Sequence, residues 1–378
     1  MKHLRKQIAG YLLTLILLMA GIVFPGSGEK VLASGGSMTV HFLDVGQGLS
    51  ILVQSEGQNL LYDGGPRSAS SYVVSYLQEQ NVLEIDYLIS SHYDEDHVSG
   101  LIGCLNAFQV DNVIGADYIH DSSLYGSFMD AAHGLEVQHP AVGAEYTFGS
   151  GEFTILSPKE ISKESNANSV AIKLTNGENS FVFTGDADFN CEADMVNSGL
   201  DLSCDVLSVG HHGSATSTSW DFLQAAVPEF AVISCGAGNM YGHPHADTME
   251  KLSDMGIQVY RSDEQGTIVA SSDGSAITWS ADPCNDYTSG DGETAGQSEG
   301  ENGFTAEDNS GTDAAAASEK SEQIAAADDS QEKMVWISAT GSKYHSIPDC
   351  GNMNPDKAYQ EPVSQAEAQG YEACKKCF

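Results

Sequence analysis

The sequence predicts an α/β domain between residues 38 and 281, in which strands and helices alternate along the chain. Two observations predict this class. Short apolar runs, such as 38–44 and 205–209, have the length and composition of buried strands. Between such runs lie segments with helical spacing, such as 71–80, in which apolar side chains gather on one face. Two sheets with helices on their outer faces satisfy this pattern.

The individual elements follow from the same signals. The first half of the domain is expected to hold three strands separated by glycine-containing turns, a helix, a fourth strand and the start of a second helix, at 38–44, 50–54, 58–62, 71–80, 87–90 and 98 onwards. The second half begins with a hairpin that turns at Asn176-Gly177, with strands at 168–174 and 180–184. Further strands are expected at 205–209, 230–234, 258–260 and 266–271, and helices at 219–226 and 246–255.

The N-terminus has the pattern of an export signal. A basic segment containing Lys2, Arg5 and Lys6 precedes an apolar run at 11–24, and the small-residue pattern Val31-Leu32-Ala33 follows. The run has about 14 residues, fewer than the roughly 20 needed to cross a bilayer. We therefore expect residues 1–33 to be a cleaved signal peptide and the mature chain to be secreted, without a membrane span. An uncleaved anchor helix is the alternative.

The composition changes beyond the domain. Residues 286–333 are dominated by Gly, Ser, Ala, Asp and Glu and predict a disordered acidic linker. Residues 335–378 regain aromatic residues and cysteines and resemble the small metal-binding module of the Ada type through 340–345 and 370–377. The expected ligands of a tetrahedral zinc ion there are His345, Cys350, Cys374 and Cys377, and a disulfide between two of these cysteines is the alternative. Such a module is expected to dock to a surface, DNA or a partner.

The chain is strongly acidic, with 53 acidic residues, 16 basic residues and a formal net charge of −37. This charge repels polyanions at long range, so metal ions and local contacts would have to hold any nucleic-acid substrate. A solubility feature of an extracellular protein explains the acidic excess equally well. The hydrophobic fraction of 41% excludes global disorder.

One loop between a predicted strand and a predicted helix gives the strongest chemical signal. It reads Ser91-His92-Tyr93-Asp94-Glu95-Asp96-His97. Its carboxylates repel one another unless a cation or solvent intervenes. A strand end followed by a helix start points these side chains in two directions, so one loop can serve two metal ions. An exposed acidic loop with two incidental histidines is the alternative.

Two distant segments also end predicted strands with polar residues. They read Thr184-Gly185-Asp186 and Val209-Gly210-His211-His212-Gly213-Ser214. Layered α/β folds place their chemistry at strand ends. Together with the first loop, these segments would supply His, Asp and His ligands from three strand ends.

On these motifs the domain resembles the metallo-β-lactamase superfamily and, more narrowly, the metallo-hydrolase domain of ComEC-type competence proteins. The narrower resemblance also rests on the motifs Leu43-Asp44-Val45-Gly46-Gln47-Gly48, Tyr62-Asp63-Gly64-Gly65 and Tyr241-Gly242-His243-Pro244-His245. It spans nearly all of residues 38–281. It implies a four-layer αββα sandwich of metallo-β-lactamase type that holds two divalent metal ions, zinc or manganese.

The resemblance also implies a ligand set. One ion would be held by His92, Asp94 and Asp186, and the other by Asp96, His97, Asp186 and His211, with Asp186 bridging the two. Asp94 stands where the superfamily usually has histidine, and this oxygen ligand raises manganese as a rival to zinc. A later histidine ligand of the superfamily has no obvious counterpart, because Asn168 or Ser169 occupies that region. Two cations roughly 3.5–4 Å apart would create a bridging hydroxide nucleophile at neutral pH.

Other polar residues of these motifs are expected to support the ligands or assist the reaction. Asp63, Asp44 and Asn168 are expected to hold the ligands by hydrogen bonds. His243 or His212 is expected to assist the leaving group, with Asp96 as a further catalytic residue. Orientation of His211 is the alternative role of His212. Three further histidines of the domain are interpreted as structural: His120, His133 and His139.

The expected function is a secreted metal-dependent phosphodiesterase or nuclease, for which the resemblance suggests DNA as the substrate. One alternative is a hydrolase of another substrate: a cell-surface phosphodiester, a lactone or a β-lactam. The other is an exported binding protein without catalytic activity.

Overall fold

The computed structural model describes residues 36–132, 134–290, 334–337, 343–345, 359–362 and 371–374. The predicted signal peptide, His133, Cys350, Cys377 and the predicted linker beyond residue 290 lie outside the described residues. The chain divides into two compact units, residues 1–302 and 303–378. Each unit is described by itself.

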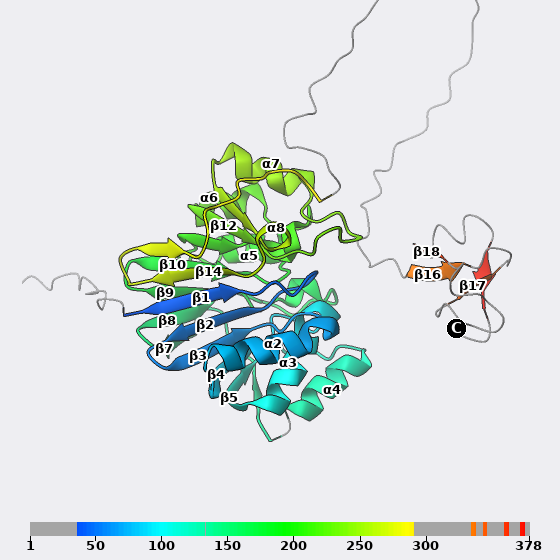
Figure 1. Cartoon of the computed structure of the whole chain (residues 1–378), viewed down its shortest axis with the longest axis horizontal. Coiled ribbons are helices and arrows are strands. Elements are labelled where there is room, and N and C mark those ends of the chain that lie inside the picture. The colour runs from blue at the N-terminus through cyan, green and yellow to red at the C-terminus, as the bar shows by residue number, and fades with distance from the viewer. Residues whose placement is uncertain are drawn as a thin grey trace, which may run out of the picture. The chain divides into compact units, whose positions relative to one another are not determined.

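The first unit contains two mixed β-sheets (Figure 1). One sheet has eight strands in the order β15-β14-β1-β2-β3-β4-β5-β6. Neighbours from β3 to β6 are parallel, and the other neighbours are antiparallel. The strands are β1 Met38–Phe42, β2 Ile51–Ser55, β3 Gln58–Tyr62, β4 Glu84–Ile89, β5 Gln109–Ile114, β6 Val137–Gln138, β14 Ile268–Ser272 and β15 Ile277–Trp279.

The second sheet has seven strands in the order β13-β12-β11-β10-β9-β8-β7. Neighbours from β10 to β13 are parallel, and the other neighbours are antiparallel. Its strands are β7 Glu145–Phe148, β8 Gly151–Ile155, β9 Ile172–Asn176, β10 Asn179–Phe183, β11 Val206–Ser208, β12 Phe230–Ile233 and β13 Gln258–Arg261.

Helices cover the outer face of each sheet (Figure 1). The first sheet carries α2 Ser70–Glu79, α3 Glu95–Ala107 and α4 Ser123–Ala131, and the second carries α5 Phe189–Val196, α6 Trp220–Ala226 and α7 Ala246–Asp254. Short helical turns are η1 Arg67–Ala69, η2 Asn166–Asn168, η3 Gly210–Gly213 and α8 Ser262–Gln265. None of the helices in the described ranges is both long enough and apolar enough for a bilayer span. The layers form the αββα sandwich, which confirms the predicted fold class.

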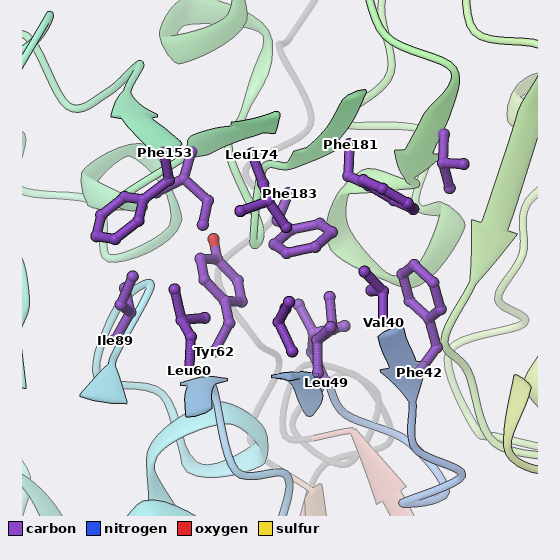
Figure 2. Packing of buried hydrophobic residues seen from close by; sticks show 14 of the residues in the cluster. Val40, Phe42, Leu49, Leu60, Tyr62, Ile89, Phe153, Leu174, Phe181 and Phe183 are labelled. Atoms are coloured by element: carbon purple, nitrogen blue, oxygen red, sulfur yellow. The ribbon is translucent and has the colours of Figure 1, made fainter. Parts of the chain in front are cut away.

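The main hydrophobic core lies between the two sheets (Figure 2). Val40, Phe42 and Tyr62 point from the first sheet toward Phe181 and Phe183 of the second. The rings of Phe42 and Phe183 meet edge to face at 6.1 Å. Complete burial of such a side chain contributes about 1.5–3 kcal/mol. This core therefore fixes the two sheets, and the loops at their strand ends, relative to each other.

Two glycines allow the first ligand loop to dock on the neighbouring turn. The amide of Gly64 donates a hydrogen bond to His97 O, and the amide of Gly100 donates one to Gly65 O. A Cβ atom on Gly100 would lie 1.7 Å from Gly64 O, so only glycine fits between the turn and α3. The close approach explains why two sequence motifs, 62–65 and 91–97, act as one structural unit.

Several elements differ from the sequence prediction. Helix α3 begins at Glu95 rather than near 98, which places Asp96 and His97 in its first turn. The strand predicted at 168–174 begins only at Ile172, because Asn166–Asn168 form a turn. The domain also continues beyond residue 281, since Tyr287 Oη donates to Ile257 O and the amide of Gly290 donates to Pro244 O.

The second unit contains a four-stranded sheet in the order β18-β16-β17-β19. Its strands are β16 Met334–Ile337, β17 Lys343–His345, β18 Tyr359–Pro362 and β19 Glu372–Ala373. Of the predicted zinc ligands, Cys374 is buried, and the side chain of His345 is outside the described set. The zinc or disulfide state of this unit stays a prediction.

Candidate metal centre

The carboxyl ends of parallel strands from both sheets meet at one edge of the sandwich. In the first sheet, β3 leads to Asp63, β4 to the loop that begins at Ser90, and β5 to the loop that begins at Gly115. In the second sheet, β10 leads to Asp186 and β11 leads to the His211-His212 pair. This topology gathers segments that are distant in sequence.

Asp63 is the fully buried anchor of the first ligand loop. One carboxylate oxygen accepts a hydrogen bond from the Ser91 amide at 2.7 Å. The other accepts from Ser91 Oγ at 2.7 Å and from His97 Nδ1 at 2.8 Å. Asp63 has a φ of +56°, in the left-handed region that Asp and Asn tolerate best among non-glycine residues. Its position behind His97 suits the supporting role expected from the sequence.

One donor group consists of Asp96, His97 and His212, and Asp186 lies within 3.6 Å of both histidines. An overlapping group joins His97 and Asp186 to His92. His97 Nε2 lies 3.2 Å from His212 Nε2 and 3.2 Å from Asp186 Oδ1. His212 Nε2 lies 3.3 Å from Asp96 Oδ2 and 3.6 Å from Asp186 Oδ2. Donors bound tetrahedrally at the usual 2.0–2.1 Å would lie roughly 3.4 Å apart, so this spacing suits one cation.

A second donor group shares Asp186. His92 Nε2 lies 3.5 Å from Asp94 Oδ2 and 3.9 Å from Asp186 Oδ2. His211 Nε2 lies 3.5 Å from the same Asp186 oxygen. Asp186 therefore stands between the two groups, as the sequence motifs suggested.

The two adjacent histidines lie in positions that differ from the expected ones. The sequence prediction placed His211 with Asp96 and His97, whereas the structure places His212 there and turns His211 toward the side of Asp186 that faces His92. Both residues have left-handed backbones, with φ of +50° and +56°, at a cost on the order of 1–3 kcal/mol each. Both Nε2 atoms lie within 3.6 Å of the same oxygen, Asp186 Oδ2, so motif spacing alone does not decide between the two histidines.

The tautomers of the histidines show that the cluster fits a cation. His97 Nδ1 faces the Asp63 carboxylate, and His212 Nδ1 lies 2.8 Å from Ser234 O, which only accepts. Each Nδ1 therefore carries a proton, and two Nε2 lone pairs face each other at 3.2 Å. His92 Nε2 and Asp186 Oδ1 are buried without a hydrogen-bond partner. A bound cation satisfies all of these atoms at once.

The electrostatics of the cluster favour a positive charge. Burial opposes ionisation of Asp186, but the three surrounding histidines hold its pKa well below the ordinary value. Burial likewise opposes a charge on His97, but the nearby carboxylates raise its pKa well above the usual range, so a proton competes with a cation for the Nε2 lone pair of the neutral ring. The same negative field attracts a divalent cation.

His243 lies beside the cluster and is held by Gln47. Gln47 Oε1 accepts from the Gly236 amide at 3.1 Å, so its NH₂ group faces His243 Nδ1 at 3.2 Å. His243 Nδ1 is therefore an acceptor, and the ring proton is on Nε2. The His243 ring lies 5.5 Å from that of His211. Burial and the neighbouring histidines lower the His243 pKa to about 3.

Two predicted supporting residues lie farther from the donors than expected. Asp44 is exposed, and its carboxylate accepts from the Gly46 amide within its own loop. It therefore shapes the loop that carries Gln47 and contacts no ligand. Asn168 is fully buried and ties the preceding loop together through hydrogen bonds with Ser162 and with Glu164 O.

Sequence reasoning missed two residues at Asp94. Ser165 Oγ donates to Asp94 Oδ1 at 2.6 Å, and His120 Nε2 lies 3.3 Å from the same oxygen. His120 had been interpreted as structural. His139, by contrast, contacts Gly115 O and has the structural role expected of it. No sequence signal connects Ser165 or His120 with the first ligand loop, because only the fold brings them together.

Comparisons with known proteins agree with this geometry. A sequence model described as "Metallo-beta-lactamase superfamily" matches residues 43–237, about half of the chain. "Competence protein ComA" of Neisseria gonorrhoeae is 33% identical over 67% of this chain and 34% of that protein. "ComE operon protein 3" of Bacillus subtilis is 28% identical over 68% of this chain and 38% of that protein.

"Recombination protein 2" of Haemophilus influenzae is 34% identical over 56% of this chain and 26% of that protein. The chain thus spans about a third of the length of these relatives. Their names confirm the predicted resemblance to ComEC-type competence proteins. The family match and the αββα sandwich, with histidine and aspartate donors at its strand ends, show that the chain belongs to the metallo-β-lactamase superfamily.

Proposed function

We propose that the protein is an exported, metal-dependent phosphodiesterase that acts on DNA. The observation that carries the proposal is the donor cluster, in which nitrogen and carboxylate atoms from three strand ends face one another. Two of these atoms, His92 Nε2 and Asp186 Oδ1, are buried without a hydrogen-bond partner. Metallo-β-lactamase folds generally bind divalent cations and catalyse hydrolysis, and the cluster offers donors suited to both zinc and manganese.

The distances suggest how the donors divide between two cations. His92, Asp94, Asp186 and His211 would hold one cation, and Asp96, His97, Asp186 and His212 the other. The three carboxylates make the set harder than an all-histidine site, which supports manganese as a rival to zinc. Asp186 Oδ1 faces His97, and Asp186 Oδ2 lies within 3.9 Å of His92, His211 and His212. The carboxylate therefore contacts both groups and is suited to bridge them.

Bound cations would supply Lewis acidity that activates water and offsets negative charge on the substrate oxygens. The residues of the chain prepare the site for this chemistry. Asp63 holds His97 in the tautomer that leaves Nε2 free. His243 carries its proton on Nε2 and is placed to donate a hydrogen bond to an oxygen of the bound substrate.

The names of the relatives support a DNA substrate. Two of the relatives are named for competence or the ComE operon and one for recombination. The net charge of −37 disfavours long-range attraction of DNA, so binding would depend on the metal centre and its loops. We expect activity on DNA to need a divalent cation and to show weaker salt dependence than in a basic nuclease.

Asp186→Asn tests the proposed activity, because it keeps the shape of the side chain and removes the bridging charge. We expect the variant to hydrolyse bis-p-nitrophenyl phosphate and linear or single-stranded DNA at least roughly 100-fold more slowly than the wild type with manganese or zinc. Asp194→Asn is the matched control, since Asp194 is half-exposed on α5 and its ion pair among the described residues is with Lys159.

Equal turnover by the wild type and Asp186→Asn, with both folded by circular dichroism, would refute the proposed hydrolase. Hydrolysis of nitrocefin, but of neither phosphodiester, would instead favour a β-lactam substrate. Export is tested separately by expressing the full chain and sequencing the N-terminus of the protein in the medium. An N-terminus after Ala33 supports secretion, and retention of all protein in cells contradicts it.

A further inference from the structure

The two carboxylate oxygens of Asp94 have different surroundings. Oδ1 accepts a hydrogen bond from Ser165 Oγ at 2.6 Å and lies 3.3 Å from His120 Nε2. Oδ2 lies 3.5 Å from His92 Nε2, on the side of the cluster. We propose that Ser165 and His120 are positioning residues that occupy Oδ1 and so make Asp94 a ligand through Oδ2 alone. This inference rests on the proposed metal centre.

A directed chain of hydrogen bonds fixes the Ser165 proton. The Tyr93 amide donates to Tyr118 Oη at 3.1 Å. Tyr118 Oη lies 2.8 Å from Ser165 Oγ. Because the carboxylate of Asp94 only accepts, Ser165 donates to it, and Tyr118 in turn donates to Ser165. Each hydroxyl proton in this series of hydrogen bonds has one acceptor, so the Ser165 proton points at Asp94.

The orientation of His120 is fixed in a similar way. The Ser122 amide donates to His120 Nδ1 at 3.3 Å, and Ser122 Oγ lies 2.8 Å from the same nitrogen. Because the amide can only donate, Nδ1 accepts from both groups and the ring proton is on Nε2. Ser122 also caps α4, since its hydroxyl oxygen accepts from the Tyr125 amide. His120 is about a quarter exposed, and its protonated Nε2 faces Asp94. The start of α4 thus holds His120 against the ligand.

Hydrogen bonds from the side chain of Asn168 hold the loop that contains Ser165. Asn168 Oδ1 accepts from the Ser162 amide at 2.7 Å, and its Nδ2 donates to the carbonyl oxygens of Ser162 and Glu164. A fully buried asparagine therefore sets the position of the hydroxyl that meets Asp94. This gives Asn168 a role at the metal centre that passes through Ser165 and not through a ligand contact.

A carboxylate with one occupied oxygen prefers to bind a cation through the other. This mode suits zinc and other cations of low coordination number, whereas calcium often takes both oxygens of a carboxylate. Asp94 stands where the superfamily usually has a histidine, which also offers one donor atom. Ser165 and His120 would make the aspartate act as a single-atom ligand in that place.

The test compares Ser165→Ala with Ser165→Thr and Ser162→Ala in the full-length protein. Zinc affinity is measured by calorimetric titration, and the geometry by the visible spectrum of the cobalt-loaded protein. We expect Ser165→Ala to raise one of the two zinc dissociation constants roughly 10–100-fold, because one of the two sites contains Asp94, and to change the cobalt spectrum. Ser165→Thr keeps the hydroxyl and should restore both. Ser162→Ala removes a hydroxyl of the same loop whose hydrogen bond, within the described ranges, is with the Glu164 amide, and it should change neither the zinc affinity nor the cobalt spectrum.

His120→Gln and His120→Leu form a second pair, because only glutamine can present an N–H group to Asp94. We expect His120→Gln to retain the wild-type zinc affinity more closely than His120→Leu. If the wild type binds zinc but Ser165→Ala matches it in affinity and cobalt spectrum, the inference is wrong while the proposed function stands. If the wild type binds no zinc or cobalt in the domain, the proposed centre itself fails.

Discussion

Asp63→Asn separates the charge behind His97 from the shape of the ligand loop. The φ of +56° at this residue is one that asparagine tolerates, so the backbone turn is expected to survive. The side-chain oxygen of the new asparagine can still accept a hydrogen bond from the Ser91 backbone amide, which lies 2.7 Å from Asp63 Oδ1 in the wild type. The amide nitrogen then faces His97 Nδ1, where the wild type has a carboxylate oxygen at 2.8 Å.

Two donors would meet at that position, and the conflict is relieved when the His97 proton moves to Nε2. Nε2 is the atom that faces His212 and Asp186, so the change blocks a ligand position. Loss of such a supporting group weakens metal binding by about 10–100-fold, which corresponds to roughly 1.4–2.8 kcal/mol. The lost hydrogen bonds to a charged group remove about 1.5–3 kcal/mol each from the free energy of unfolding.

The assay measures zinc affinity by calorimetric titration and the free energy of unfolding by urea, with and without zinc. Asp86→Asn is the matched control, because Asp86 also accepts from a backbone amide and a side-chain amide but belongs to β4 away from the cluster. It should reduce stability without reducing zinc affinity. Wild-type zinc affinity in Asp63→Asn would refute the argument that Asp63 sets the His97 tautomer.

Three further predictions test other parts of the structure. Burial raises the pKa of Glu192 to about 7 from an ordinary 4.5, so the folded state binds this proton more tightly than the unfolded state. The contribution of Glu192 to the free energy of unfolding therefore falls by roughly 3 kcal/mol as pH rises from below 4.5 to above 7. Urea titrations across this range should show a smaller fall in Glu192→Gln, and equal slopes would contradict the prediction. Gln47→Met removes the donor to His243 Nδ1 and should lower kcat roughly tenfold, with metal content unchanged by mass spectrometry. Metal loss in this variant would show that the loop supports the ligands instead. Gly100→Ala places a methyl group against Gly64 O and should reduce the free energy of unfolding by about 3 kcal/mol in urea, whereas an unchanged midpoint would mean that the turn and α3 separate easily.

The sheets could be predicted where the sequence signal is local. Strands such as β1, β10 and β11 are mostly buried on both faces, and their apolar residues stand out from the flanking turns. The strands β7 and β8 were missed because their residues are only partly buried, and polar side chains interrupt the pattern. The start of α3 was placed late because acidic residues of a first helical turn look like loop residues in sequence.

The candidate site could be predicted only as far as its motifs reach. His92, Asp96, His97 and Asp186 follow strands directly, so the topology of parallel strands brings them together. The choice between His211 and His212 depends on two consecutive left-handed residues, which motif spacing does not encode. Ser165 and His120 reach Asp94 from loops 71 and 26 positions away in sequence, and neither lies in a recognisable motif. The contacts of these two residues exist only in the folded chain.

The metal content of the purified protein tests the central claim most directly. The full-length wild type and a variant with His92, His97 and Asp186 all replaced by alanine are exposed to zinc or manganese, dialysed and analysed by mass spectrometry. Any zinc bound by the C-terminal unit contributes equally to both proteins and does not affect the difference between them. The account predicts two more cations per chain in the wild type than in the folded variant. Equal metal content in the two proteins would contradict it.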